Sequence, residues 1–408
     1  MILYFTYCVL LSVFLLNIGS YLDFSFSAIG VGIGARTAVV GIAALGIVGL
    51  IVISRGIHKL VWRELLMALA VWGPFLFYLA LRVDSSNSYS ELKFVKIISI
   101  SFLCVATITV AYLCDARAFL RMLPIVIIIF SVLLGVEALL HPQQFRYRSV
   151  IERMTVEGMN PIWLARDFAL AGVCLFLLPV KKNLVKLVGL AFVVIGILPT
   201  GSRGPLISLI VTLTVWFVTQ SDRARGRLMA AVVCASILAV GGLLFAEDRI
   251  ESIINSYFSR GQNQGLLEES GRPQLFRIAM DEFLSSPVVG VGLGAYGKSI
   301  ISSSMSHTIQ SGKGNYPHNI ILEILAELGV LGWILASIAM RPGRWMFNMR
   351  NPYFYPFVLT LLYSMSSGDI NTNTGVFIFG TLARLTTQYP VMEEIPFNAE
   401  LTGEGSPT

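Results

Sequence analysis

Long apolar runs separated by short polar segments make up most of this chain. A helix needs about 20 mostly apolar residues to cross the hydrocarbon core of a bilayer, and runs of this kind recur almost to the C-terminus. We interpret about twelve of them as membrane-spanning helices. Their ranges are 2–19, 37–53, 65–82, 94–113, 119–140, 161–180, 184–199, 205–220, 228–245, 318–340, 353–366 and 373–389. The pattern predicts an all-α fold, a polytopic transmembrane helical bundle of about 12 spans.

The composition agrees with this interpretation. Of the 408 residues, 55% are hydrophobic and 13% are charged, and the mean hydropathy is +0.74, whereas roughly a quarter of the residues in a soluble domain are charged. The first apolar run lacks a basic start and a small-residue cleavage site, so we expect it to be retained as a helix. Twelve spans would leave little room for a separate soluble domain.

The cysteines and the charge exclude several classes of protein. The 5 cysteines lie in or at the edge of apolar runs, without a CxxC pair, so neither a disulfide framework nor a zinc site is indicated. The net charge of +6 could suggest a nucleic acid partner. Because the basic residues concentrate in short loops between predicted spans, we expect a membrane and no nucleic acid.

The loops also predict an orientation. With the N-terminus inside, the short inner loops are all basic and the alternating loops carry fewer lysines and arginines. The inner loops are 54–64, 114–118, 181–186, 221–227 and 341–352. By the positive-inside rule both termini are cytoplasmic. The long outer segments are then 141–160 and 246–317, and long loops of this kind usually carry function.

Arg203 lies at the predicted outer end of a span, against this rule. It stands in PTGSRGPLISLIV, residues 199–211, where Pro205 favours the start of a helix. Backbone N–H groups and the positive end of the helix dipole would face outward beside the guanidinium, a combination suited to phosphate. The alternative is an arginine that extends to the lipid headgroups. Other outer-side exceptions are Arg146, Arg148 and Arg153.

The second outer segment contains a predicted helix and a glycine run. The helix covers SGRPQLFRIAMDEFLSSP, residues 270–287, with a candidate cap at Ser270. Its apolar positions are Leu275, Ile278, Ala279, Phe283 and Leu284. Arg272 lies in the first turn, where the dipole disfavours a cation unless an anion binds there; the alternative is a solvated arginine. GVGLGAYG, residues 290–297, lacks the preceding strand of a dinucleotide site, which favours a tight turn over a phosphate cradle.

The span that begins in YPHNIILEILAELGVLGWIL, residues 316–335, carries His318 at its outer end. Histidine is the side chain best able to exchange protons near neutral pH, although a lone interfacial histidine can also be a packed residue. Glu323 and Glu327 share one helical face, where carboxylates need a polar interior or a partner. Candidate counterions are Arg166 and Arg384, and Asp369 lies on the outer side before the last span.

Together these motifs resemble the O-antigen ligase and O-antigen polymerase superfamily. The resemblance is carried by SRG at an outer helix start, by an arginine-led loop helix that runs to P-x-x-G-x-G-x-G, and by HN-x7-E-x-G-x-x-G in a span. It implies a fold like that of GT-C glycosyltransferases, with one large extracytoplasmic loop. We therefore expect N-terminal transmembrane helices at 1–160, a ligase- or polymerase-like core at 161–389 including periplasmic loop 246–317, and a disordered cytoplasmic tail at 390–408.

The resemblance also implies a reaction and a site. The enzyme would work at the outer face of the bacterial inner membrane, with an undecaprenyl-diphosphate-linked glycan as donor and lipid A-core or another glycan as acceptor. Arg203 and Arg272 would clamp the diphosphate, and His318 would deprotonate or position the acceptor hydroxyl. The supporting residues that match the family pattern are Asn319, Glu327, Gly329 and Gly332. No metal ion or other cofactor is implied, and the outer loops contain no DxD motif.

Two alternatives to a ligase stay open. A polymerase of O-antigen or exopolysaccharide would use the same donor chemistry to join repeat units; the compact SRG and the one dominant outer loop favour a ligase. A polysaccharide or lipid transporter would have two related halves and charges near the midplane of the membrane. Here the halves look dissimilar and the singular charges lie at the outer interface.

Overall fold

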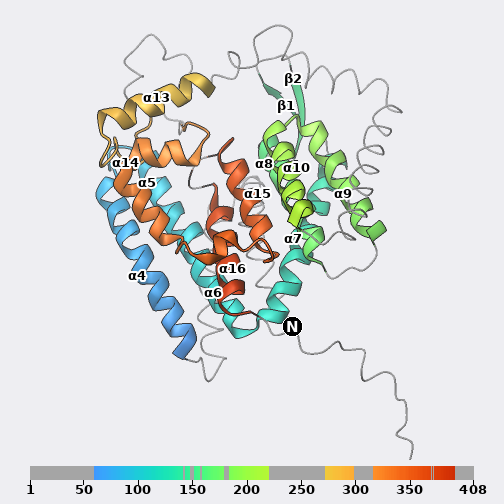
Figure 1. The fold of residues 1–408 in the computed structure, drawn as a ribbon. Helices are drawn as coiled ribbons and strands as arrows, with labels where there is room; N and C mark the ends of the chain where they lie inside the picture. Colours follow the sequence, from blue (N-terminus) through green and yellow to red (C-terminus); the bar gives the residue numbers. More distant parts are fainter. Residues whose placement is uncertain are drawn as a thin grey trace, which may run out of the picture.

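Helices account for nearly all of the structure, a computed structural model that describes residues 59–140, 143–147, 151–156, 159–178, 183–219, 272–297, 316–368, 370 and 372–390. Most of them form a bundle whose axes run roughly from one end of the molecule to the other, and α13 lies across one end (Figure 1). The predicted spans 2–19, 37–53 and 228–245 lie outside the described residues, as does the tail beyond residue 390.

Every predicted span that falls on described residues coincides with helix. The helical elements are α4 (Lys59–Arg82), α5 (Ser88–Lys96), η1 (Ile97–Phe102), α6 (Leu103–Cys114), α7 (Ala116–Leu140), α8 (Pro161–Leu177), α9 (Asn183–Ile197), η2 (Leu198–Thr200), α10 (Arg203–Thr219), α13 (Arg272–Ser285), α14 (Ile320–Ala339), η4 (Arg344–Phe347), α15 (Phe354–Ser364) and α16 (Thr374–Gln388). Of these, α4, α7 and α14 are long and apolar enough to cross a membrane. The count of twelve spans stays a prediction.

One element departs from the predicted all-α fold. The outer segment 141–160 contains an antiparallel hairpin of β1 (Gln143–Tyr147) and β2 (Ile151–Thr155). Pairing the two arms satisfies backbone groups that a bare loop would leave to solvent. The hairpin and α13 lie at the same end of the bundle (Figure 1). We call this the outer end, after the predicted orientation.

Asparagine caps begin three helices at the outer end. The side chains of Asn87, Asn160 and Asn319 accept hydrogen bonds from the first backbone N–H groups of α5, α8 and α14. Such caps satisfy donors that have no partner within the helix. The start of α10 follows a sharp reversal at Gly201, which adopts a left-handed conformation with φ of 62°.

Aromatic side chains and small residues pack the helices together. Phe168 of α8 is buried against α7 and α9, where a Cβ at Gly135 or Gly196 would crowd its ring. Trp72 of α4 packs edge-on against Phe377 of α16, with ring centroids 5.2 Å apart. Small residues that let helices approach closely are typical of membrane bundles, where lipid removes the hydrophobic drive for association.

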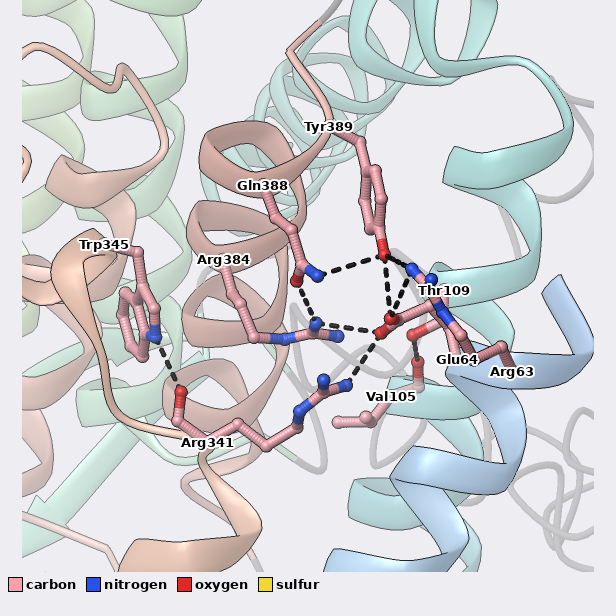
Figure 2. A network of polar contacts seen from close by, with 9 residues as sticks. All are labelled: Arg63, Glu64, Val105, Thr109, Arg341, Trp345, Arg384, Gln388 and Tyr389. Atoms are coloured by element: carbon pink, nitrogen blue, oxygen red, sulfur yellow. Dashed lines mark hydrogen bonds and ion pairs between the residues drawn. The ribbon is translucent and has the colours of Figure 1, made fainter. Parts of the chain in front are cut away.

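The inner end of the bundle is held by an ion cluster around Glu64 of α4 (Figure 2). Arg341 and Arg384 donate to Glu64 Oε2 at 2.7 and 3.0 Å, and the Tyr389 hydroxyl donates to Oε1 at 2.9 Å. Because Glu64 is 1% exposed, it needs these partners to remain charged. The cluster joins α4 to the inner ends of α14 and α16. Arg384 therefore pairs with Glu64, and not with Glu323 or Glu327, for which it was a candidate counterion.

Candidate functional site

The turn between α15 and α16, residues 365–373, collects contacts from three helix starts at the outer end. Met365 O accepts a hydrogen bond from Asn319 Nδ2 at 3.3 Å, at the start of α14. A Cβ at Gly204, in the first turn of α10, would lie 2.7 Å from Ser366 Oγ. Ser367 O accepts from Arg166 of α8. We call residues 365–373 the outer turn; of these, Asp369 and Asn371 lie outside the described residues.

Arg203 is the first residue of α10, two positions before the start that Pro205 suggested. Its side chain is half-buried. The preceding residues are fixed locally, because Thr200 Oγ1 accepts from the Ser202 N–H at 3.2 Å and the Thr200 hydroxyl donates to Ile197 O at 2.6 Å. Arg203 therefore sits at a rigid helix N-terminus, where N–H groups and dipole favour an anion.

His318 lies two residues before the first residue of α14, in a left-handed backbone conformation with φ of 59°. Its half-buried ring packs edge-on against Tyr316, with centroids 4.5 Å apart. The neighbouring Asn319 caps α14 by accepting from the Ile321 and Leu322 N–H groups at 3.0 and 3.1 Å. His318 thus stands directly before a capped helix start, with its ring in contact with Tyr316.

Arg272 is the first residue of α13, as the helix predicted over 270–287 requires, but its side chain lies outside the described residues. The predicted apolar face is correct for Ala279, which is buried against Ala326 of α14. It is wrong for Leu284, which is 65% exposed. The buried position is taken by Glu282, whose carboxylate accepts the Gly297 N–H at 2.9 Å. A carboxylate can be buried at position 282 because the tight turn places the Gly297 N–H beside it, and this buried donor needs an acceptor.

The glycine run forms a turn packed on α14. Val291 and Gly292 donate their N–H groups to the α14 carbonyls of Ala326 and Glu327, each at 2.9 Å, and the Gly294 N–H donates to Glu327 Oε2 at 2.9 Å. The N–H groups that a phosphate cradle would need are therefore engaged within the protein. This outcome agrees with the tight turn that the sequence favoured.

Helix α14 breaks where the turn packs. Gly329 has φ of 66° and ψ of −170°, a conformation nearly restricted to glycine. The N–H groups of Val330 and Leu331, freed by the break, donate to Pro287 O and Val288 O at 2.9 and 3.1 Å. The Tyr78 hydroxyl donates to Leu328 O at 2.8 Å and to Val289 O at 2.9 Å. Backbone groups on both sides of the break therefore have hydrogen-bond partners, which irregular backbone within a membrane would need.

The two buried carboxylates of α14 share a cation that sequence reasoning missed. Lys93 of α5 donates to both oxygens of Glu327, at 2.8 and 2.7 Å, and also pairs with Glu323. The predicted counterions were wrong: Arg384 belongs to the inner cluster, and Arg166 donates to Tyr363 O and Ser367 O at the outer turn. The signal in the sequence was a lysine at the outer edge of an apolar run.

Tyr296 completes the contact between α13 and α14. Its hydroxyl donates to Leu275 O at 2.7 Å. Burial, and then the carboxylates of Glu282, Glu323 and Glu327, raise the pKa of the phenol. Tyr296 therefore stays protonated near neutral pH and keeps its donor role. Among the described residues, no group of three or more histidine, cysteine, aspartate or glutamate side chains is placed to hold a metal ion.

Residues 187–337 match a family model described as O-antigen ligase. A comparison with curated proteins finds no match. The matched segment runs from α9 to α14, and so includes the positions of Arg203, Arg272 and His318.

Proposed function

We propose that this chain, of which residues 187–337 match a family model described as O-antigen ligase, is a ligase-type glycosyltransferase of the bacterial inner membrane. It transfers a glycan from undecaprenyl diphosphate to an acceptor hydroxyl at the outer face. The observation that carries the proposal is the convergence of two helix starts: Gly204, next to Arg203, and Asn319, next to His318, contact adjacent residues of the outer turn.

On the donor side, the leaving diphosphate gains negative charge as the bond to the sugar C1 breaks. Arg203 stands at the N-terminus of α10 and Arg272 at that of α13. Each arginine begins a helix, where backbone N–H groups and the positive end of the helix dipole favour an anion. Charge stabilisation by such fixed donors is often the largest contribution to catalysis, and two guanidiniums can supply it without a metal ion or another cofactor.

On the acceptor side, a hydroxyl oxygen attacks C1 while the C1–O bond to the diphosphate breaks, and the hydroxyl proton passes to His318. A single displacement of this kind inverts the anomeric centre. Asn319 fixes the start of α14, and Glu327, Gly329 and Gly332 shape the helix behind it. A base must lie within hydrogen-bond reach of the proton that it removes, so the proposal requires the acceptor hydroxyl to bind beside the His318 imidazole.

The acceptor is tested with purified protein in liposomes, an undecaprenyl-diphosphate glycan, and two acceptors offered separately. We expect transfer to lipid A-core. A lengthening ladder on a second carrier-linked repeat would identify a polymerase instead, and donor movement across the bilayer without transfer would identify a transporter. No product with either verified acceptor would contradict the proposed reaction.

The role of Arg203 is tested by Arg203→Ala. We expect transfer to fall by about 10²–10³-fold, the usual effect of removing one donor to a developing anion, while folding and membrane insertion persist because the side chain is half-buried at a helix end. The matched control is Arg350→Ala, an exposed arginine at the inner end. Equal activity in the two variants would contradict the proposal.

A further inference from the structure

Lys93 is a buried cation at the centre of the outer end. Its side chain is 0% exposed, and the carboxylates of Glu323 and Glu327 are 1% exposed. Removing such charges from water is costly, so an ion cluster of this kind forms only where geometry and further hydrogen bonds compensate. Residues 93 and 327 are 234 positions apart in the chain, and the cluster therefore joins α5 to α14.

Each carboxylate of the cluster also holds the backbone of another segment. Glu323 Oε2 accepts the N–H of Ile370, in the outer turn, at 2.9 Å. Glu327 Oε2 accepts the N–H of Gly294, in the glycine turn, at 2.9 Å. Hydrogen bonds to ionised acceptors are roughly twice as strong as neutral ones. One ammonium thus orients two carboxylates, and these fix two separate stretches of backbone.

Those two stretches contact the segments that carry the proposed catalytic side chains. The outer turn contacts Gly204 beside Arg203 and Asn319 beside His318. The glycine turn follows α13, which begins with Arg272, and it packs on the kink of α14. Position 294, whose N–H donates to Glu327, requires glycine. Its φ is 67°, and a Cβ there would lie 3.0 Å from Ser90 Cα of α5.

We propose that Lys93 is a positioning residue for glycan transfer. It holds the outer turn and the glycine turn in one arrangement, so that the starts of α10, α13 and α14 keep the spacing that donor and acceptor need. This inference rests on the proposed function. A displacement of about 1 Å at a catalytic group can lower the rate by about 10²-fold even when the mutated residue lies far from the reacting atoms.

Transfer kinetics of Lys93→Met provide the first measurement. We expect kcat per folded molecule to fall by about 10- to 100-fold, with the KM for the undecaprenyl-diphosphate glycan changed by less than about threefold. Lys93→Arg keeps the charge and should retain more activity than Lys93→Met. The matched control is Arg384→Met, which removes a buried cation from the inner cluster and leaves Glu64 paired with Arg341. Its kcat should stay near that of the unmodified protein.

Amide hydrogen exchange provides a second measurement that does not depend on activity. In Lys93→Met the N–H groups of Ile370 and Gly294 should exchange at least about tenfold faster, whereas amides in the middle of α8 and α16 should not change. Arg384→Met should leave both amides protected. Faster exchange of these amides together with unchanged kcat would overturn the positioning role.

A third variant covers the case in which Lys93→Met does not fold. The triple substitution Lys93→Met, Glu323→Gln and Glu327→Gln removes every charge of the cluster, so no buried ion is left without a partner. We expect it to fold and to show the same loss of kcat. Full activity in the folded triple variant would overturn the inference. Failure of the unmodified protein to transfer glycan would instead contradict the proposed function. Amide exchange at Ile370 and Gly294 would then still test whether Lys93 holds the outer turn and the glycine turn in place.

Discussion

His318 combines a side chain suited to proton transfer with a backbone conformation that few residues adopt. Its φ of 59° lies in the left-handed region, where asparagine, aspartate and histidine are several-fold enriched among residues other than glycine. Alanine there is disfavoured by its Cβ and has no side chain that can hydrogen-bond locally. Substitutions at this position therefore change chemistry and local stability to different degrees.

The two effects can be separated by comparing His318→Asn with His318→Ala. Asparagine tolerates the left-handed backbone but cannot accept a proton as a base, so we expect thermal stability near that of the unmodified protein and transfer lower by about 10²–10⁴-fold. Alanine should lose transfer to the same degree and should also lose about 1 kcal/mol of stability. The measurements are thermal unfolding in detergent and initial rates in liposomes.

The contrary result is informative. If His318→Asn transfers glycan at close to the normal rate, the imidazole positions the acceptor through a hydrogen bond that an amide can replace, and the base lies elsewhere. Stability and transfer rate are measured separately on two variants of the same position. A loss of stability in His318→Ala alone is therefore assigned to the backbone, and a loss of transfer in both variants to the missing imidazole.

At the scale of the element, the kink of α14 depends on Gly329. A Cβ there would overlap the backbone of Val288, and φ of 66° with ψ of −170° is strained for any other residue. Gly329→Ala should therefore lower the folded yield and destabilise the protein by about 1–3 kcal/mol or more. The control is Gly73→Ala in α4, where nothing lies within 4 Å of the added Cβ. Equal melting temperatures for the two variants would show that the packing of Val288 against Gly329 does not stabilise the protein.

Helix positions could be predicted from the sequence, but the kink could not. The predicted span 318–340 differs from α14 by two residues at its start and one at its end, because an apolar run of the right length marks a helix without reference to its neighbours. A glycine inside such a run is also common in straight membrane helices. The break at Gly329 is stabilised by hydrogen bonds to the carbonyls of Pro287 and Val288. These two residues are about 40 positions away in the sequence and come close to Gly329 only in the folded chain.

The same reason explains the hairpin and the register of α13. Strands β1 and β2 are too short for a clear alternating pattern, so segment 141–160 was predicted as loop. In α13, Leu284 belongs to the apolar spacing of the sequence, yet it is 65% exposed, while Glu282 is buried because the glycine turn offers its carboxylate an N–H. Local patterns carry no information on such partners.

At the scale of the molecule, an ion cluster lies at each end of the helix pair α4 and α14. The inner cluster is centred on Glu64 (Figure 2), and the outer one on Lys93. In the proposed arrangement the candidate site depends on the outer cluster, whereas the sequence pointed only to the arginines, the histidine and the two carboxylates as candidates. Lys93 could not be assigned, because a lysine at the edge of an apolar run is equally consistent with contact to lipid headgroups. Only the fold shows that this lysine is fully buried.

The orientation of the whole molecule decides whether the candidate site faces the glycan donor. Basic inner loops predict that α13 lies outside and that the segment after α14, with Arg341, Arg344 and Arg350, lies in the cytoplasm. Leu284 of α13 and Phe347 of η4 are 65% and 82% exposed. In a cysteine-free background, Leu284→Cys should react with a membrane-impermeant maleimide after the outer membrane is opened, and Phe347→Cys only after the inner membrane is also disrupted.

Each cysteine serves as the control for the other, because both side chains are exposed and differ only in the end of the bundle that carries them. The reverse labelling pattern would place Arg203 and His318 in the cytoplasm. A carrier-linked glycan at the outer face could not reach them there, so that result would contradict both the orientation and the proposed reaction. Labelling of both cysteines while the inner membrane is intact would contradict the assignment of the two ends of the bundle to opposite sides of the membrane.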